Sequence, residues 1–151
     1  MDIREKLETL IRPICENSGF YLLDIKIRGT GRNPVIQVFA DNEKGITIDD
    51  CANLSRQISD ELDMDEAFSV MNYRLDVSSP GLDHPLQYDW EFKKNLGRSL
   101  VVKYWIEEEK LWRVTGELID FNPEQIVLKT KHGNLEIKRN DIQQAKVKLQ
   151  W

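Results

Sequence analysis

A nine-residue segment rich in proline and glycine, Ser78-Ser79-Pro80-Gly81-Leu82-Asp83-His84-Pro85-Leu86, interrupts every hydrophobic pattern in this chain. Proline removes backbone donors and glycine favours turns, so neither a helix nor a central strand is expected to cross this segment. The sequence predicts two domains, residues 1–78 and residues 87–151, joined by an interdomain linker at 79–86. The predicted linker contains Ser79, Pro80, Gly81, Leu82, Asp83, His84 and Pro85.

The first half shows the order α-β-β-α-β. Apolar residues recur at helical spacing over 2–18 and over about 49–63, which predicts two amphipathic helices. Alternating or short apolar runs predict strands at 20–28, 35–40 and 73–77. This order favours two helices packed on one face of a small sheet. Pro13 lies inside the first helix and is expected to kink it.

The second half has a different pattern. A short helix is predicted over 89–96, and five strands are predicted at about 98–106, 112–121, 125–131, 134–138 and 146–150. Five short strands of this kind favour an SH3-like or Sm-like small β-barrel. The whole chain is therefore expected to be α+β.

Two strands carry finer expectations about which side chains share a face. In the strand at 20–28, alternation predicts one apolar face made of Tyr21, Leu23, Ile25 and Ile27. In the strand at 112–121, the apolar parity changes between Val114 and Ile119, which predicts a bulge at Gly116.

The net charge of −5 combines two unlike halves: residues 1–86 carry −7, and residues 87–151 carry +2. A net acidic protein is a poor candidate for binding duplex DNA, because neutralising phosphates requires a cationic surface. The charge difference indicates distinct surfaces and two kinds of partner.

Three groups of charged residues are candidate partner-binding sites. The acidic end of the second helix is either a solvated face or a docking surface for a basic protein. The tip of the hairpin predicted over 20–40 is either solvated or contacts RNA. The lysines of the last strands either protect strand edges or form a groove for phosphates or an acidic peptide. These groups are, in order, Asp60, Glu61 and Asp63; Arg28 and Arg32; and Lys129, Lys131, Lys138, Lys146 and Lys148.

The residue types of enzymes and metal sites are present without the necessary spacing. Ser78, Ser79, Asp83 and His84 have the chemistry of a nucleophilic triad, but they share one turn and lack a G-x-S-x-G motif. We expect no catalytic residue, no metal and no cofactor. Cys15 and Cys51 lie on apolar helix stripes and are expected to pack in the core. Trp105 and Trp112 flank one hairpin, and at least one of them is expected in the core.

No stretch approaches the ~18–20 apolar residues of a membrane span, and the charged residues Asp2, Arg4 and Glu5 do not fit a secretory signal. With only two cysteines in the chain, these features predict a protein of the reducing cytoplasm that does not bind membranes.

The segment from Tyr73 to Leu86 resembles the signature of the ribosome maturation factor RimP family, and its Ser-Ser-Pro-Gly-Leu-Asp core is specific. Further similarities are the Thr47-Ile48-Asp49-Asp50-Cys51 helix start, Phe92 with Gly97, and Ile142 with Ala145-Lys146-Val147. The family usually has arginine where this chain has His84. If that arginine anchors the linker, His84 would do so more weakly and with pH dependence.

The resemblance implies an N-terminal α/β domain followed by an SH3-like barrel. It implies a non-catalytic, cytoplasmic, monomeric assembly factor for maturation of the small (30S) ribosomal subunit. Such a factor binds free or immature small subunits through a basic ribosomal protein near the decoding region, through rRNA, or through both. The alternatives are a general single-stranded RNA-binding Sm-like module and a hydrolase centred on Ser79 and His84.

Overall fold

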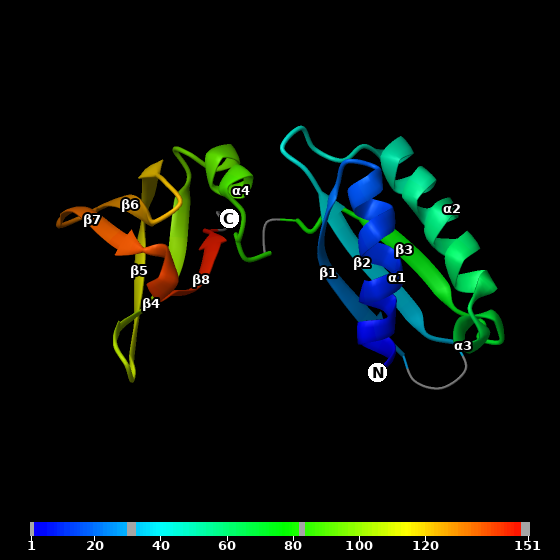
Figure 1. Cartoon of the computed structure of the whole chain (residues 1–151). Helices are drawn as coiled ribbons and strands as arrows, with labels where there is room; N and C mark the ends of the chain where they lie inside the picture. Colours follow the sequence, from blue (N-terminus) through cyan, green and yellow to red (C-terminus); the bar gives the residue numbers. More distant parts are fainter. Residues whose placement is uncertain (1, 30–32, 82–83, 149–151) are drawn as a thin grey trace. The chain divides into compact units, whose positions relative to one another are not determined.

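The computed structural model describes residues 2–29, 33–81 and 84–148. The chain divides into two compact units, Met1–Pro80 and Gly81–Trp151, and each is described by itself (Figure 1). Both contain helices and antiparallel strand pairs, so the α+β class predicted from the sequence is confirmed.

In its described residues, the N-terminal unit contains three helices and a three-stranded sheet of order β1-β2-β3. Strands β1 and β2 are antiparallel, whereas β2 and β3 are parallel. The predicted order of elements is present with one addition, the short helix α3. The elements are α1 (Ile3–Asn17), β1 (Tyr21–Arg28), β2 (Val35–Asp41), α2 (Ile48–Met64), α3 (Glu66–Ser69) and β3 (Arg74–Ser78).

Short polar side chains begin the two long helices. The carboxylate of Asp2 accepts the backbone N–H of Glu5 at 2.8 Å, and Thr47 and Asp50 form a reciprocal capping box. Such caps satisfy backbone donors that have no partner within the helix. Helix α1 continues through Pro13 and ends before Gly19, whose φ of 87° suits the left-handed turn after a helix.

The apolar stripes of α1 and α2 pack with the sheet in one core, as the hydrophobic pattern predicts. Figure 1 shows α1 and α2 running beside the three strands. Each fully buried aliphatic side chain stabilises the fold by about 1.5–3 kcal/mol. The core is formed by Leu7, Ile11, Cys15, Leu22, Ile25, Ile36, Val38, Ala40, Leu54, Ile58, Leu62 and Phe68.

The predicted face of β1 is wrong. The β1–β2 register shifts between Leu22 and Asp24, so Leu22 and Ile25 are both buried although they are three residues apart, and Ile27 is exposed. The carboxylate of Asp24 accepts the N–H of Ile25 and bonds the Arg4 side chain, each at 2.8 Å. A bulge changes which side chains face the core, and strict alternation cannot predict it.

The described part of the C-terminal unit is a short helix followed by a five-stranded antiparallel sheet of order β7-β6-β5-β4-β8. Its core contains Phe92, Leu100, Val102, Leu118, Ile126, Leu128, Ile137 and Ala145. The elements are α4 (Asp89–Lys94), β4 (Ser99–Glu107), β5 (Lys110–Phe121), β6 (Gln125–Thr130), β7 (Gly133–Lys138), the 3₁₀ turn η1 (Arg139–Asp141) and β8 (Ile142–Val147).

The sheet differs from the prediction in two respects. Among the described residues β7 and β8 are its two edges and do not pair, so a closed barrel is not observed. The last strand also begins at Ile142, four residues earlier than predicted, and Leu149 lies outside the described residues. The register between β4 and β8 shifts between Lys103 and Tyr104. The side chains of β8 therefore do not alternate strictly, and a period-two pattern does not reveal where the strand begins.

The irregularity in β5 is also displaced from the predicted bulge at Gly116. The register shifts between Leu118 and Asp120, so Leu118 is buried and Ile119 is exposed. Gly116 has a different role, because a Cβ atom there would lie only 2.9 Å from the carbonyl oxygen of Lys129. Glycine at this position permits the close approach of β5 and β6. Within the described ranges, no helix has the length and apolar character needed to cross a bilayer.

Candidate partner-binding surfaces

The last turns of α2 carry an exposed acidic surface. Asp60, Glu61 and Asp63 are all exposed there, as the sequence predicted, and Met64 beside them is 74% exposed. Residues four apart lie on one side of a helix, so Asp60 and Met64 form a mixed acidic and apolar patch. The hydroxyl of Tyr73 donates to Asp63 at 3.0 Å. Burial and this hydrogen bond raise the pKa of Tyr73.

Asp65 belongs to the fold of the N-terminal unit. Its carboxylate pairs with Lys6 Nζ at 3.0 Å and accepts the N–H of Ala67 at 2.9 Å at the start of α3. The hydrogen bond from Lys6, followed by that from Ala67, holds the pKa of Asp65 below its usual value. Asp65 therefore joins α1 to α3, and the acidic surface consists of Asp60, Glu61 and Asp63.

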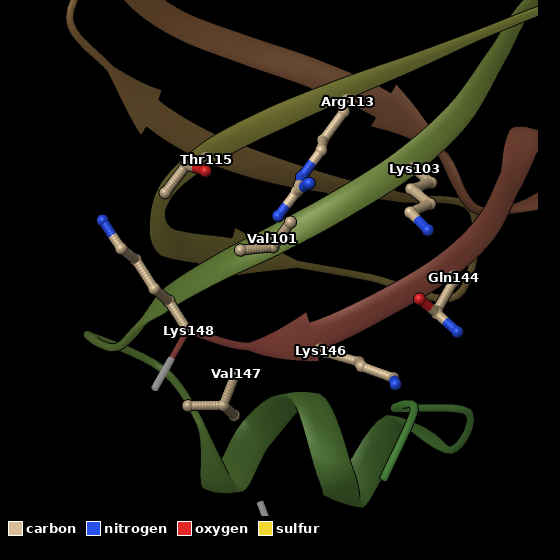
Figure 2. Close-up of a pocket in the computed structure, with 8 residues that line it drawn as sticks. All are labelled: Val101, Lys103, Arg113, Thr115, Gln144, Lys146, Val147 and Lys148. Carbon is tan, nitrogen blue, oxygen red and sulfur yellow. The ribbon is translucent and has the colours of Figure 1, made fainter. Parts of the chain in front are cut away.

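A basic groove lies across three adjacent strands of the C-terminal unit (Figure 2). Strand register places Arg113 of β5, Lys103 of β4 and Gln144 of β8 in one row, and Thr115, Val101 and Lys146 in the next. The hollow measures about 720 Å³, and no acidic residue is among its described lining residues. They are Val101, Lys103, Arg113, Thr115, Gln144, Lys146, Val147 and Lys148.

The groove includes only some of the predicted basic residues. Lys146 and Lys148 line it, whereas Lys129 lies opposite Glu117 and Lys138 opposite Gln125 on other strands. Lys131 is exposed in the turn before β7. Lys103 and Arg113 were missed because the sequence prediction considered only the C-terminal run of lysines. Their alternation with the buried residues Leu100, Val102 and Leu118 was the available signal.

The predicted basic hairpin tip is only partly described. The Nε of Arg28 donates to Gln37 Oε1 at 2.7 Å across the β1–β2 pair. Arg32 lies outside the described residues. A joint role of the two arginines therefore stays a prediction.

The β4–β5 hairpin extends beyond its neighbours. Strand β8 pairs with β4 only as far as Tyr104, and β6 pairs with β5 only from Glu117. Residues 105–112 therefore project from the sheet (Figure 1). Trp105 is 39% exposed and Trp112 is 55% exposed. The prediction that at least one of them lies in the core is wrong, because no strand among the described residues flanks this end of the hairpin.

Part of the predicted linker packs within the C-terminal unit. His84, Pro85 and Leu86 are half-buried, and Leu86 N–H donates to Ala145 O at 2.7 Å. Ser79 and Gly81 are exposed, Pro80 is half-buried, and Leu82 and Asp83 lie outside the described residues. The linker role of 79–86 stays a prediction.

The described residues contain no assembled catalytic or metal site of the kinds that the sequence analysis considered. His84 contacts the carboxylate of Glu91, and the described residues contain no group of three potential metal ligands. Cys15 is buried, and burial raises its pKa to about 11. Cys51 is partly buried, which also raises its pKa.

The fold and these surfaces define a two-unit α+β protein whose candidate binding sites are open and charged. The family model described as the RimP N-terminal domain matches residues 10–83. This match confirms the resemblance to the RimP family, a family of ribosome maturation factors, that the segment from Tyr73 to Leu86 carries.

Proposed function

We propose that this protein is a cytoplasmic, non-catalytic assembly factor that binds free or immature small (30S) ribosomal subunits. The match of residues 10–83 to the RimP N-terminal domain carries this proposal. A difference in affinity between immature and mature particles would suffice, because a factor that prefers one conformation shifts the population towards it.

In this proposal the acidic surface of α2 binds a basic ribosomal protein near the decoding region. Asp60, Glu61 and Asp63 supply negative charge, and Met64 supplies exposed apolar area next to it. Complementary charge accelerates encounter and selects the partner, while apolar contact contributes affinity. In this proposal the protein acts as a monomer, and the five-stranded sheet of its C-terminal unit is SH3-like.

Sedimentation through a sucrose gradient tests the proposal. The full-length chain is expected with free or immature small subunits and to be depleted from complete ribosomes. Equal association with both would contradict the proposed function. If the chain instead associates with every RNA-containing fraction, whichever subunit that fraction holds, the result would favour the alternative of a general single-stranded RNA-binding module.

A charge reversal on α2 tests the contact surface. Asp60→Lys with Glu61→Lys is expected to weaken small-subunit association by about tenfold, since close charge pairs contribute measurably across interfaces. Lysine near a helix C-terminus is compatible with the helix dipole, so α2 remains folded. The control is Glu8→Lys with Glu16→Lys, which makes the same change of charge on α1. Equal effects of both pairs would contradict a specific contact at α2.

A further inference from the structure

We propose that the outer face of β5, β4 and β8 in the C-terminal unit is a binding site for single-stranded RNA. In this site the basic groove holds phosphates, and Trp105 at its end stacks on a base. This inference rests on the proposed function and names the RNA-binding part of the same protein.

The cations of the groove oppose one another across the sheet. Lys103 and Arg113 are direct cross-strand partners on β4 and β5, and both line the groove with Lys146 and Lys148. Like charges directly opposite each other destabilise a strand pair. Such a local conflict is typical of a functional surface, since a bound anion relieves the repulsion.

The side chains of these residues gather over one hollow. Figure 2 shows Arg113, from β5, reaching over β4 towards Val101, while Lys148 extends from the end of β8 on the other side of that strand. Thr115 and Gln144 line the same hollow and add uncharged hydrogen-bonding groups. Several cations and hydroxyl or amide groups on one concave surface are suited to a chain of phosphates.

An aromatic and apolar row continues this face along the hairpin. Trp105 lies opposite Leu111, two residues from the Lys103–Arg113 row on each strand. Two residues of a strand span about 7 Å. Alternation places Trp105 and Leu111 on the same side as Lys103 and Arg113, whereas Trp112 lies opposite Tyr104 on the other side.

This combination favours single-stranded RNA over an acidic peptide or a duplex. An acidic peptide would use the cations but would not require an exposed indole at the end of the row. A duplex keeps its base faces stacked, so it offers nothing for Trp105 to stack on. Unpaired bases stack on exposed aromatic side chains, and their phosphates are bound by neighbouring cations.

Fluorescence anisotropy of the full-length chain with a labelled 12-nucleotide single-stranded RNA tests the inference. Lys103→Gln with Arg113→Gln is expected to weaken binding by about tenfold or more and to reduce the slope of log K against log salt by about 1.4, at ~0.7 per phosphate contact. The matched control, Lys44→Gln with Arg56→Gln, removes two exposed cations from the N-terminal unit. It is expected to change the affinity by less than about twofold.

The tryptophans provide a second test on one hairpin. Trp105→Ala is expected to weaken RNA binding by about five- to tenfold, in the lower part of the range for base stacking. Trp112→Ala removes a more exposed indole from the opposite side, so it is expected to leave the affinity within about twofold. Circular dichroism of each variant establishes that the sheet is folded, and a Trp105→Phe variant that retains most of the binding supports stacking even if Trp105→Ala fails to fold.

Three results would overturn the inference: absence of RNA binding by the folded wild-type chain, equal losses in the groove and control variants, or displacement of the RNA by its duplex or by poly-glutamate at lower concentration than by unlabelled single strand. Sedimentation with small subunits is measured in parallel. Subunit association without RNA binding would overturn this inference alone, whereas groove-dependent RNA binding without subunit association would contradict the proposed function alone.

Discussion

In the C-terminal unit, the Nε2 atom of His84 lies 3.9 Å from the Oε2 atom of Glu91, and the two side chains are only 11% and 5% exposed. The other carboxylate oxygen of Glu91 accepts the N–H groups of Gln87 and Tyr88, each at 3.1 Å. Among the described residues, Nε2 has no hydrogen-bond partner. Glu91 thus holds the chain at the start of α4, whereas its contact with His84 lacks a hydrogen bond.

His84→Arg is expected to stabilise the C-terminal unit by about 1 kcal/mol. Arginine is always charged and offers a planar set of donors that can reach a carboxylate at hydrogen-bond distance. Urea unfolding followed by tryptophan fluorescence measures the change. His132→Arg places the same residue in an exposed turn and is expected to change stability by less than about 0.5 kcal/mol. An unchanged or lowered stability of His84→Arg would mean that the longer side chain cannot fit beside Glu91.

Arg139 joins three segments of the C-terminal unit. It donates to Asn122 O at 3.1 Å and to Gln87 O at 3.0 Å. It also pairs with Asp89 and lies 4.7 Å from the ring centroid of Phe92. Arg139→Ala is expected to cost about 2–3 kcal/mol, because several charge-assisted hydrogen bonds are lost together.

Chemical unfolding measures this cost, with Arg139→Lys as the informative comparison. Lysine keeps the charge but cannot donate to all these acceptors at once, so it is expected to recover less than half of the loss. The control is Arg98→Ala at an exposed position. Full recovery with lysine would show that charge, rather than the geometry of the guanidinium, holds these segments together.

Gly116→Ala is expected to destabilise the C-terminal unit by about 1–3 kcal/mol through overpacking. The new Cβ would lie 2.9 Å from Lys129 O and 3.1 Å from Leu128 Cβ. Because the first contact is with backbone, β5 and β6 would have to separate. Hydrogen exchange should therefore increase for the amides of the β5–β6 pair.

Gly97→Ala separates this steric effect from backbone strain. Gly97 has a φ of 86°, and a Cβ atom there would have no described atom within 4 Å apart from its own chain neighbours. Its substitution is expected to cost about 1–2 kcal/mol through the left-handed backbone conformation. Selective loss of protection in the β5–β6 pair with Gly97→Ala, but not with Gly116→Ala, would contradict the role assigned to Gly116.

The cysteines should react at very different rates with a thiol-specific disulfide reagent at pH 8. Cys15 is buried with a pKa raised to about 11, so about one thiol in a thousand is ionised at this pH. Partly buried Cys51, whose pKa is also raised, is expected to react more slowly than a free thiol but faster than Cys15. Cys51→Ser should leave labelling limited by opening of the N-terminal unit. Rapid labelling of this variant would contradict the burial of Cys15.

Elements whose apolar pattern repeats over several turns were predictable from the sequence, whereas local irregularities of the backbone were not. The stripe of Leu7, Ile11 and Cys15 repeats over several turns, so its helix and buried face follow from spacing alone. The bulge at Leu22 and Asp24 depends on local hydrogen bonding by Asp24. It shifts the buried face by one residue, and nothing in the apolar pattern reveals such a shift.

The binding surfaces were predictable only where charge is concentrated along the chain. Asp60, Glu61 and Asp63 are close in sequence and stay together on one helix. The groove instead combines Lys103, Arg113 and Lys146 from three strands, and their proximity depends on strand order and register. A β8 that follows β7 in the chain but pairs with β4 cannot be inferred from a linear charge run.

The projecting β4–β5 hairpin also has consequences for self-association. Beyond Tyr104 on β4, the backbone edge has no partner on β8 in the part of the chain described, and such an edge can accept a strand from another molecule. The end of β4 and the turn that follows it carry Glu107, Glu108 and Glu109 in succession. Two copies that met edge to edge would bring these carboxylates together. Electrostatic repulsion at the tip of the hairpin therefore disfavours the pairing of this edge with a strand of another molecule.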